Sequence, residues 1–312
     1  MKKIAFLFPG QGSQKVGMGQ DLFQTFGFVR EIFETADEIA GAPVSRLCFE
    51  GPMQVLTETV NLQPAVTAVN LACLAAIDTA GVACSFSAGH SLGEYSALTS
   101  AGVLSMADTL RLVHKRGELM HRESLKQKGA MSAIVGLDIG EVETVVAAGK
   151  KKGVVSVANH NSEHQIVITG SPDGVAAVSE MVKSRGARAI PLKVSGAWHS
   201  DLIKGAEEEF GAFLKTFSFN TPTNKVIHNV TADSCDNDKV IRQLMTLQLC
   251  SPVRWFDTIQ RLVTEQVEVF VEVGPGKVLA GLLKKILPPD LEASVFNVNT
   301  IPTLESFLSE MQ

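Results

Sequence analysis

The chain has 312 residues, of which 45% are hydrophobic and 20% charged, with 26 glycines and 12 prolines. This composition is typical of a globular protein and excludes a disordered, collagen-like or coiled-coil chain, while the length predicts one large domain or two unequal ones. The formal net charge of −5 gives no excess of Lys and Arg for a nucleic-acid backbone, so we expect no nucleic-acid partner.

The cysteines and the N-terminus favour a soluble cytoplasmic protein. The five cysteines are widely scattered and form no C-x-x-C pair, which is typical of a reducing compartment. Only five apolar residues, Ile4–Phe8, follow Met-Lys-Lys before Pro9, too few for a signal peptide. No run approaches the roughly 18 apolar residues of a membrane-spanning helix, so we expect no membrane association. We further expect a monomer.

The first part of the chain alternates short apolar runs with helical patterns. Apolar runs of strand length predict buried strands, and apolar residues at helical spacing predict helices. The predicted elements in chain order are strand 3–8, helices 21–40 and 64–80, strand 82–88, a short helix ending at Ala101, and helix 106–126. Strands that alternate with helices in this way favour a parallel sheet.

The middle of the chain has a different order: strand 130–135, helix 138–149, strands 153–159 and 164–169, helix 173–185 and strand 187–193. This βαββαβ order is the ferredoxin-like pattern. The alternating pattern then returns with helix 202–216, strand 224–230, helices 238–249 and 254–264, strand 267–273 and a further helix. We predict an α/β fold in which a large domain, 1–127 and 196–312, is interrupted by a ferredoxin-like domain, 128–195.

The segment Gly89–Gly93 reads Gly-His-Ser-Leu-Gly between a predicted strand and a predicted helix. In this context G-x-S-x-G is the nucleophile elbow, a sharp turn that exposes a serine hydroxyl beside a helix N-terminus, where a developing oxyanion is stabilised. The pattern by itself is also compatible with an inert turn, because Gly and Ser are common in turns. With a strand before it and a helix after it, the pattern favours Ser91 as a nucleophile.

A serine nucleophile needs a general base, and seven histidines compete for that role. His114 and His121 lie among charged neighbours on a predicted helix, where they are expected to face solvent. His160 and His164 flank a predicted hairpin, and His228 lies in a predicted strand. His90 adjoins the serine, but neighbours across such a turn point apart. His199 lies where the chain returns to the large domain. The sequence physics alone leaves His199 as one candidate among several.

Arg116 lies at the edge of the apolar stripe of the predicted helix 106–126. An arginine in this position needs an anionic partner, because an unpaired buried charge is costly. The partner is either a ligand carboxylate or an Asp or Glu of the chain itself, and the sequence alone slightly favours the second. By themselves, Gln11 reads as a polar loop residue and Gln248 as a surface residue at a helix end.

Two glycine-rich segments do not fit nucleotide-binding motifs. After Gly10-Gln11-Gly12, the dinucleotide fingerprint needs Gly or Ala where this chain has Lys15. Gly276-Lys277 lacks both the following Ser or Thr and the earlier glycine of a phosphate-binding loop. Neither an H-E-x-x-H motif nor a Cys/His quartet with metal-site spacing occurs. We therefore expect no metal site and no permanently bound cofactor.

Several motifs follow one another along nearly the whole chain: Phe8–Gln14, Gly89–Glu94, Arg116-Gly117, Ala197–Ser200, Asn229–Thr231, Gln248 with Pro252–Trp255, and Glu272–Gly276. In this order and spacing they resemble the malonyl-CoA:acyl-carrier-protein transacylases, which load malonyl groups for fatty-acid synthesis. The resemblance implies an α/β-hydrolase-like core with a ferredoxin-like insertion. It also implies that malonyl-CoA is the substrate and that acyl carrier protein is the partner.

The resemblance assigns roles to individual residues. It implies that Ser91 becomes acylated and that His199 is its general base. The main-chain N–H groups of Gln11 and Leu92 would form the oxyanion hole. The main-chain carbonyl of Gln248 would orient His199, so that the site is a dyad without a carboxylate.

The resemblance also implies that Arg116 forms a bidentate pair with the free carboxylate of the malonyl group. Two positions depart from the family pattern. Trp198 stands where malonyl-selective members usually have Phe, and the larger ring should still exclude α-branched acyl groups. Ile203 stands where Met is usual, which is a volume-conserving change.

Three classes of function follow from these residues. The first is an acyltransferase that moves a malonyl group from coenzyme A to acyl carrier protein, with a stand-alone polyketide acyltransferase or a malonate-decarboxylase loading subunit as close variants. The second is a serine hydrolase that releases the acyl group to water. The third is a non-catalytic module that docks an acyl carrier. A carboxylate-binding Arg116 favours the first class over the second, and the pairing of Ser91 with His199 opposes the third.

Overall fold

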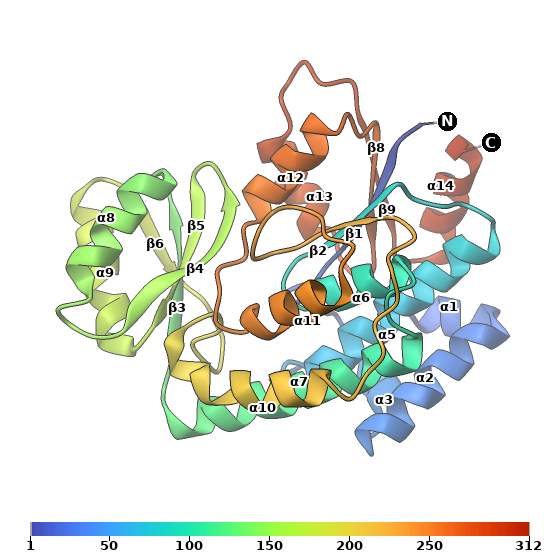
Figure 1. The fold of residues 1–312 in the computed structure, drawn as a ribbon, viewed down its shortest axis with the longest axis horizontal. Coiled ribbons are helices and arrows are strands. Elements are labelled where there is room, and N and C mark those ends of the chain that lie inside the picture. The colour runs from blue at the N-terminus through green and yellow to red at the C-terminus, as the bar shows by residue number, and fades with distance from the viewer. Residues whose placement is uncertain (1, 312) are drawn as a thin grey trace.

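The computed structural model describes residues 2–311 and contains two separate β-sheets (Figure 1). The larger sheet has five strands in the order β7-β2-β1-β8-β9, and every neighbouring pair is parallel. Its strands are β1 (Ile4–Phe8), β2 (Phe86–Gly89), β7 (Lys225–Ile227), β8 (Val269–Val273) and β9 (Ser294–Val298). The predicted α/β class with a parallel sheet is confirmed.

The central strands consist of apolar residues that are buried along their whole length. Every residue of β1, Ile-Ala-Phe-Leu-Phe, and every residue of β8 is buried, as expected for a parallel sheet covered on both faces. In the register of β1 with β2, Phe8 lies opposite Gly89. The loops that follow these two strands therefore leave the same edge of the sheet side by side, and they carry the Pro-Gly-Gln-Gly and Gly-His-Ser-Leu-Gly segments.

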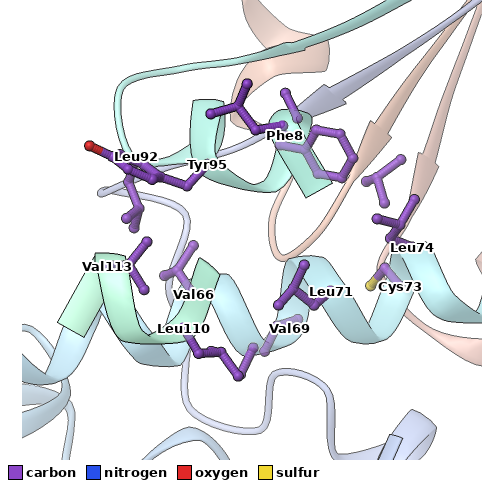
Figure 2. Close-up of a cluster of buried hydrophobic side chains, with 14 of the residues drawn as sticks. Phe8, Val66, Val69, Leu71, Cys73, Leu74, Leu92, Tyr95, Leu110 and Val113 are labelled. Atoms are coloured by element: carbon purple, nitrogen blue, oxygen red, sulfur yellow. The ribbon is translucent and has the colours of Figure 1, made fainter. Parts of the chain in front are cut away.

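Two of the helices from the first part of the chain contact this sheet, and the others pack around these two. The helices of this part are α1 (Gln20–Thr25), α2 (Gly27–Ala40), α3 (Val44–Glu50), α4 (Met53–Leu56), α5 (Thr59–Thr79), α6 (Gly93–Ser100) and α7 (Met106–Lys126). In Figure 2, Val66 and Val69 of α5 lie beside Leu110 and Val113 of α7, while Phe8 of β1 lies above them. The two longest helices thus form one wall of the core, directly beneath the strand-to-helix turn.

Helix α5 is long and apolar enough to span a membrane by length and by its mean hydropathy of 1.5. However, 83% of that stretch is buried inside the fold, as in the central helix of a globular protein. Its polar side chains Gln63, Thr67 and Asn70 are buried as well. The helix is therefore part of the main core.

The later helices are η1 (Asp201–Ile203), α10 (Lys204–Leu214), α11 (Asp238–Leu247), α12 (Trp255–Thr264), α13 (Val278–Ile286) and α14 (Ile301–Met311). The N-terminus of α13 is bound by the buried carboxylate of Glu272 on β8, which accepts hydrogen bonds from the main-chain N–H groups of Leu279 and Ala280. Helix α14 lies against β9 at the edge of the sheet (Figure 1).

The smaller sheet is antiparallel and has the order β4-β5-β3-β6. Its strands β3 (Ala130–Val135), β4 (Val155–Ser162), β5 (Gln165–Gly170) and β6 (Arg188–Pro191) and its helices α8 (Ile139–Gly149) and α9 (Pro172–Ser184) follow the βαββαβ order. Ile166 and Ile168 of β5 face a separate apolar cluster with both helices, whereas Val167 between them packs on the main core. One face of this sheet is thus turned toward the main core.

A short stretch of backbone joins the small sheet to the segment between α11 and α12. Asn159 of β4 forms a parallel bridge with Val253, and the main-chain N–H of His160 donates to the carbonyl of Val253 at 2.9 Å. Val253 in turn donates to the carbonyl of Ala158 at 2.8 Å. The small sheet is therefore hydrogen-bonded to the segment that directly follows Gln248.

Some predicted elements differ in extent from the structure. The helix predicted at 21–40 is two helices, because Phe26 between them has the extended backbone angles φ −112° and ψ 128°. The helix predicted from Pro64 begins at Thr59, with the proline in its second turn. The strand predicted at 82–88 is restricted to Phe86–Gly89, because its partner β1 begins only at Ile4, beside Ser85. Elements α3, α4, β9 and α14 were not predicted.

Candidate active site

Ser91 lies in a sharp turn between β2 and α6. Its backbone is in the left-handed region, with φ 51°, which is uncommon for a residue with a side chain. Only glycine fits on either side of it: a Cβ on Gly89 would overlap the backbone of Gly93, and a Cβ on Gly93 would overlap the carbonyl of Phe8. The spacing of the two glycines thus reflects the close packing of the turn on β1, as the nucleophile elbow requires.

The structure brings His199 to Ser91 across 108 residues of sequence, with His199 Nε2 at 2.8 Å from Ser91 Oγ. The other ring nitrogen, Nδ1, lies 2.9 Å from the main-chain carbonyl of Gln248 and 3.0 Å from that of Ser251. Because both carbonyls can only accept, Nδ1 carries the proton and donates it. Nε2 is then the acceptor, in the tautomer that can take a proton from the Ser91 hydroxyl.

The surroundings of His199 keep its imidazole neutral. Burial, and after it the positive charge of Arg116, lower the pKa of His199 to about 3, although the hydrogen bonds to the two carbonyls act in the opposite direction. The side chain is only 4% exposed. Its backbone is also left-handed, with φ 59°. Ser91 and His199 therefore face each other from two turns that both hold unusual backbone conformations.

The other histidines point elsewhere. His90 also lines the cavity, but its Nε2 lies 2.8 Å from Oδ1 of Asn161. Nδ1 of His228 lies 2.8 Å from the carboxylate of Glu94. Of the seven histidines, all of which lie within residues 2–311, His199 is the one that contacts Ser91 Oγ.

Arg116 extends from α7 to the hydroxyl of Ser91 and is only 1% exposed. Its Nη2 lies 3.2 Å from Ser91 Oγ and 3.2 Å from Oε1 of Gln248, and its Nη1 donates to Oε1 of Gln63 at 3.0 Å. Within residues 2–311, no Asp or Glu forms an ion pair with it, so the interpretation as an internal ion pair is wrong. Burial lowers the pKa of Arg116, but a guanidinium stays protonated.

The neighbouring Tyr95 partly compensates for this isolated charge. The guanidinium carbon of Arg116 lies 5.6 Å from the ring centroid of Tyr95, a cation–π distance. Two amide oxygens and an aromatic face replace the carboxylate that a buried arginine ordinarily requires. The arrangement therefore leaves a fixed cation that can receive an anion beside Ser91.

Gln11 and Leu92 lie at the same cavity as Ser91. Leu92 directly precedes α6, so its main-chain N–H is one of the free donors at a helix N-terminus. A Cβ on Gly10 would lie 3.5 Å from the main-chain nitrogen of Leu92, which shows how closely the Gln11 loop approaches the turn. Within the described residues, neither the N–H of Gln11 nor that of Leu92 has an acceptor in the protein.

The cavity has a volume of about 110 Å³ and lies between the two sheets. It is lined by the residues discussed above and by further apolar and amide side chains: Gln11, Gln63, His90, Ser91, Leu92, Arg116, Met120, Met131, Asn159, Leu192, Val194, Trp198 and His199. Trp198 is 4% exposed and forms part of the wall next to His199. Within residues 2–311, no three His, Cys, Asp or Glu side chains come together in a way that could hold a metal ion.

Sequence reasoning missed two amides that hold the site. Asn229 accepts a hydrogen bond from the main-chain N–H of Ser91 at 2.7 Å and donates to the carbonyl of Gly89 at 2.6 Å, so it fixes the turn from both ends. Gln63 holds one arm of Arg116. Gln63 lay just outside the helix predicted from Pro64, so no signal in the sequence pointed to it. The contact of Asn229 with Ser91 joins residues 138 positions apart, and only the fold brings them together.

The parallel sheet, the glycine-flanked serine and the buried histidine define a class of α/β proteins that carry a Ser–His pair at a strand-to-helix turn. A model of the acyl transferase domain matches residues 5–305, which is nearly the whole chain. The chain belongs to this acyl transferase family.

Three relatives illustrate the similarity. The malonyl CoA-acyl carrier protein transacylase of Bacillus subtilis is 44% identical over 288 residues, which cover 92% of this chain and 91% of the relative. The crystal structure of an acyl carrier protein S-malonyltransferase from Vibrio cholerae has a TM-score of 0.92, with 38% identity over 98% of this chain and 99% of that one. A malonyl-transacylase solved in complex with a type II PKS acyl-carrier protein has a TM-score of 0.94, with 36% identity over 99% of both chains.

Proposed function

We propose that this protein transfers a malonyl group from malonyl-CoA to the phosphopantetheine thiol of acyl carrier protein, through an ester on Ser91, for fatty-acid synthesis. The observation that carries the proposal is the buried guanidinium of Arg116, which has no carboxylate partner within residues 2–311 and lies 3.2 Å from Ser91 Oγ. The names of the relatives support the same substrate and carrier.

In the first half-reaction, the hydroxyl proton of Ser91 passes to Nε2 of His199 while Oγ attacks the thioester carbonyl of malonyl-CoA. The carbonyl oxygen becomes an oxyanion, which the main-chain N–H groups of Gln11 and Leu92 stabilise. The tetrahedral intermediate then collapses, the C–S bond breaks, and the thiolate of coenzyme A takes the proton from His199. The products are malonyl-Ser91 and the free thiol of coenzyme A.

The second half-reaction repeats these steps with the carrier thiol. His199 takes the proton of the pantetheine thiol, and the sulfur attacks the ester carbonyl of malonyl-Ser91. The same two N–H groups stabilise the new oxyanion. When the ester C–O bond breaks, Oγ of Ser91 receives the proton back from His199, and the malonyl group leaves as a thioester of the carrier.

Arg116 gives this reaction its selectivity for a charged acyl group. The two terminal nitrogens of a guanidinium can bind both oxygens of the malonyl carboxylate in parallel hydrogen bonds. The carboxylate would replace the Ser91 hydroxyl as a partner of Nη2, which leaves Oγ free to attack. Trp198 and Met120 line the space around the acyl group and restrict branching at its α-carbon.

The two other classes of function make less use of the site. A simple serine hydrolase has no use for an unpaired arginine beside its nucleophile, and a docking module has no use for a buried Ser–His pair. A polyketide pathway is the closer alternative, because one structural neighbour was solved with a polyketide synthase carrier. We further propose that the protein is a cytoplasmic monomer, without a permanently bound cofactor.

Covalent labelling tests the proposal directly. Incubation with malonyl-CoA should add the mass of one malonyl group, mapped to Ser91 by peptide digestion, and a holo acyl carrier protein should then remove it. Ser91→Ala, which preserves the fold around a smaller side chain, should remain unlabelled. Labelling of Ser91→Ala would refute the assignment of the nucleophile, and rapid loss of the label to water without any carrier would identify a hydrolase.

A further inference from the structure

The reaction above makes no use of a carboxylate that is buried beneath the nucleophile turn. Glu94 follows Ser91 by three residues, in the first turn of α6, and is 1% exposed. One of its oxygens faces Nδ1 of His228 at 2.8 Å, and the other accepts hydrogen bonds from Nε2 of Gln248 at 2.6 Å and from the main-chain N–H of Asn229 at 3.3 Å. Burial of a carboxylate is costly, so a role is needed to explain why Glu94 is held here.

Two acceptors determine which way the amide of Gln248 points: the carboxylate of Glu94, which is the shorter contact of its Nε2, and the main-chain carbonyl of Ser91. A carboxylate can only accept, so the NH₂ end of the amide must face Glu94. The oxygen end then faces the other way, where Nη2 of Arg116 lies 3.2 Å from it. A guanidinium can only donate, so the reversed amide would set two donors against each other at the arginine. The amide thus connects a buried anion to a buried cation in one orientation only.

Gln248 also contacts both members of the Ser–His pair. The carbonyl of Gln248 accepts from Nδ1 of His199 at 2.9 Å, and its side-chain Nε2 also donates to the carbonyl of Ser91 at 3.0 Å. Gln248 itself is fully buried. Its side chain therefore faces the arginine while its main chain faces the histidine.

We propose that Glu94 is a positioning residue, which holds the Gln248 amide so that its oxygen fixes the guanidinium of Arg116 for the carboxylate of the substrate. Gln63 holds Nη1 from the opposite side, so each terminal nitrogen of the guanidinium has one amide oxygen as a fixed partner. Glu94 does not line the cavity. This inference rests on the proposed transfer of malonyl groups.

The substitution Glu94→Gln tests it, because it keeps the size of the side chain and introduces an NH₂ group. The oxygen of the new amide should stay with the N–H of Asn229 and with Nε2 of Gln248, while its NH₂ faces Nδ1 of His228. The charge-assisted hydrogen bond that holds the Gln248 amide is then replaced by a weaker neutral one, and Arg116 loses a firmly held partner. We expect kcat/KM with malonyl-CoA to fall about 10- to 100-fold, the value of one charge-assisted hydrogen bond, mainly through a higher KM. Transfer from acetyl-CoA, which has no carboxylate, should fall less than about threefold. Glu94→Asp, which keeps an acceptor-only carboxylate, should recover part of the malonyl preference.

Two further variants separate positioning from a general loss of stability. Glu272→Gln removes another buried carboxylate, which binds the N-terminus of α13 and does not line the cavity, and it should leave the ratio of malonyl to acetyl transfer unchanged. Gln248→Met removes the amide but keeps the main-chain carbonyl for His199, so it should lower this ratio about as much as Glu94→Gln. If Glu94→Gln does not fold, Gln248→Met still tests the contact between the Gln248 amide and Arg116.

The outcomes separate the proposed malonyl transfer from the positioning role of Glu94. A wild-type protein that takes no malonyl group from malonyl-CoA refutes the proposed function. If the wild type is active, a ratio within threefold of the wild-type value in both Glu94→Gln and Gln248→Met refutes the positioning role alone. A selective loss of malonyl transfer in these variants, with the ratio preserved in Glu272→Gln, supports it.

Discussion

The parallel and the antiparallel sheet both reach the cavity, but they contribute different kinds of groups. The loops and helices of the parallel sheet supply the half-buried Ser91, the buried Arg116 and the amide groups around them, which are joined by hydrogen bonds. The antiparallel sheet supplies Met131 and Asn159, and Leu192 lies just beyond its edge strand, as wall residues. The difference indicates that the chemistry belongs to the parallel sheet and that the small sheet encloses it. Each prediction below tests this division.

The largest effect is expected from the base. His199→Ala should lower the rate of malonyl-Ser91 formation by about 10²–10⁴-fold, because no other group in contact with Ser91 Oγ can accept its proton. The rate can be measured by rapid quenching and intact mass. A loss of only two- to threefold in a folded variant would assign the base to another histidine.

The next effect should depend on the acyl group. Arg116→Ala should lower kcat/KM for malonyl-CoA by at least about 10²-fold, since two charge-assisted hydrogen bonds to the carboxylate disappear. Transfer from acetyl-CoA should be unchanged or faster, and Arg116→Lys should restore only part of the malonyl activity because ammonium lacks the fork geometry. Equal losses with both donors, measured side by side, would make Arg116 a structural residue.

A smaller effect on activity is expected from the core of the small sheet. Ile168→Ala removes a fully buried side chain that packs with α8 and α9, so it should lower the free energy of unfolding by about 2–5 kcal/mol. The folded enzyme should still keep its kcat/KM within about threefold. Denaturation curves and initial rates measure the two quantities, and a loss of activity above tenfold in the folded state would assign the small sheet a part in the chemistry.

The smallest effect should come from pH. Because the pKa of His199 is lowered to about 3, its imidazole stays neutral and able to accept a proton well below the usual histidine range. We therefore expect kcat/KM for malonyl-CoA to stay level between pH 7 and about pH 5. A fall to half near pH 6.5, in a protein shown by circular dichroism to remain folded, would contradict the environment described here.

The elements that the sequence predicted well are those with strong local signals. Helix α7 begins and ends where its pattern predicted, at Met106 and Lys126, because Ser105 caps it by accepting the N–H of Asp108 and its apolar stripe is continuous. The βαββαβ order was correct because its strands and helices are short, regular and bounded by turns. The short helices α3 and α4 have too few residues for a periodic pattern, and they form by packing on the main core.

The site was predictable only where chemistry follows from adjacent residues. Gly89–Gly93 fixes the serine turn within five residues, so the candidate nucleophile could be found from its pattern. His199 could not be selected by its own surroundings in the sequence, because its partner lies 108 residues away and only the fold brings the two together. The orientation of the Gln248 amide was out of reach for the same reason, since it depends on Glu94 and Arg116 from two other helices.

The left-handed backbone at Ser91 has a consequence for engineering. A residue with a Cβ pays about 1–2 kcal/mol for this conformation, and glycine does not. Ser91 and His199 are two of the four non-glycine residues with positive φ among residues 2–311. Directed evolution for heat resistance, without a screen for turnover, should therefore favour glycine at position 91. Variants selected with Gly at this position would have a higher melting temperature but no acyltransferase activity.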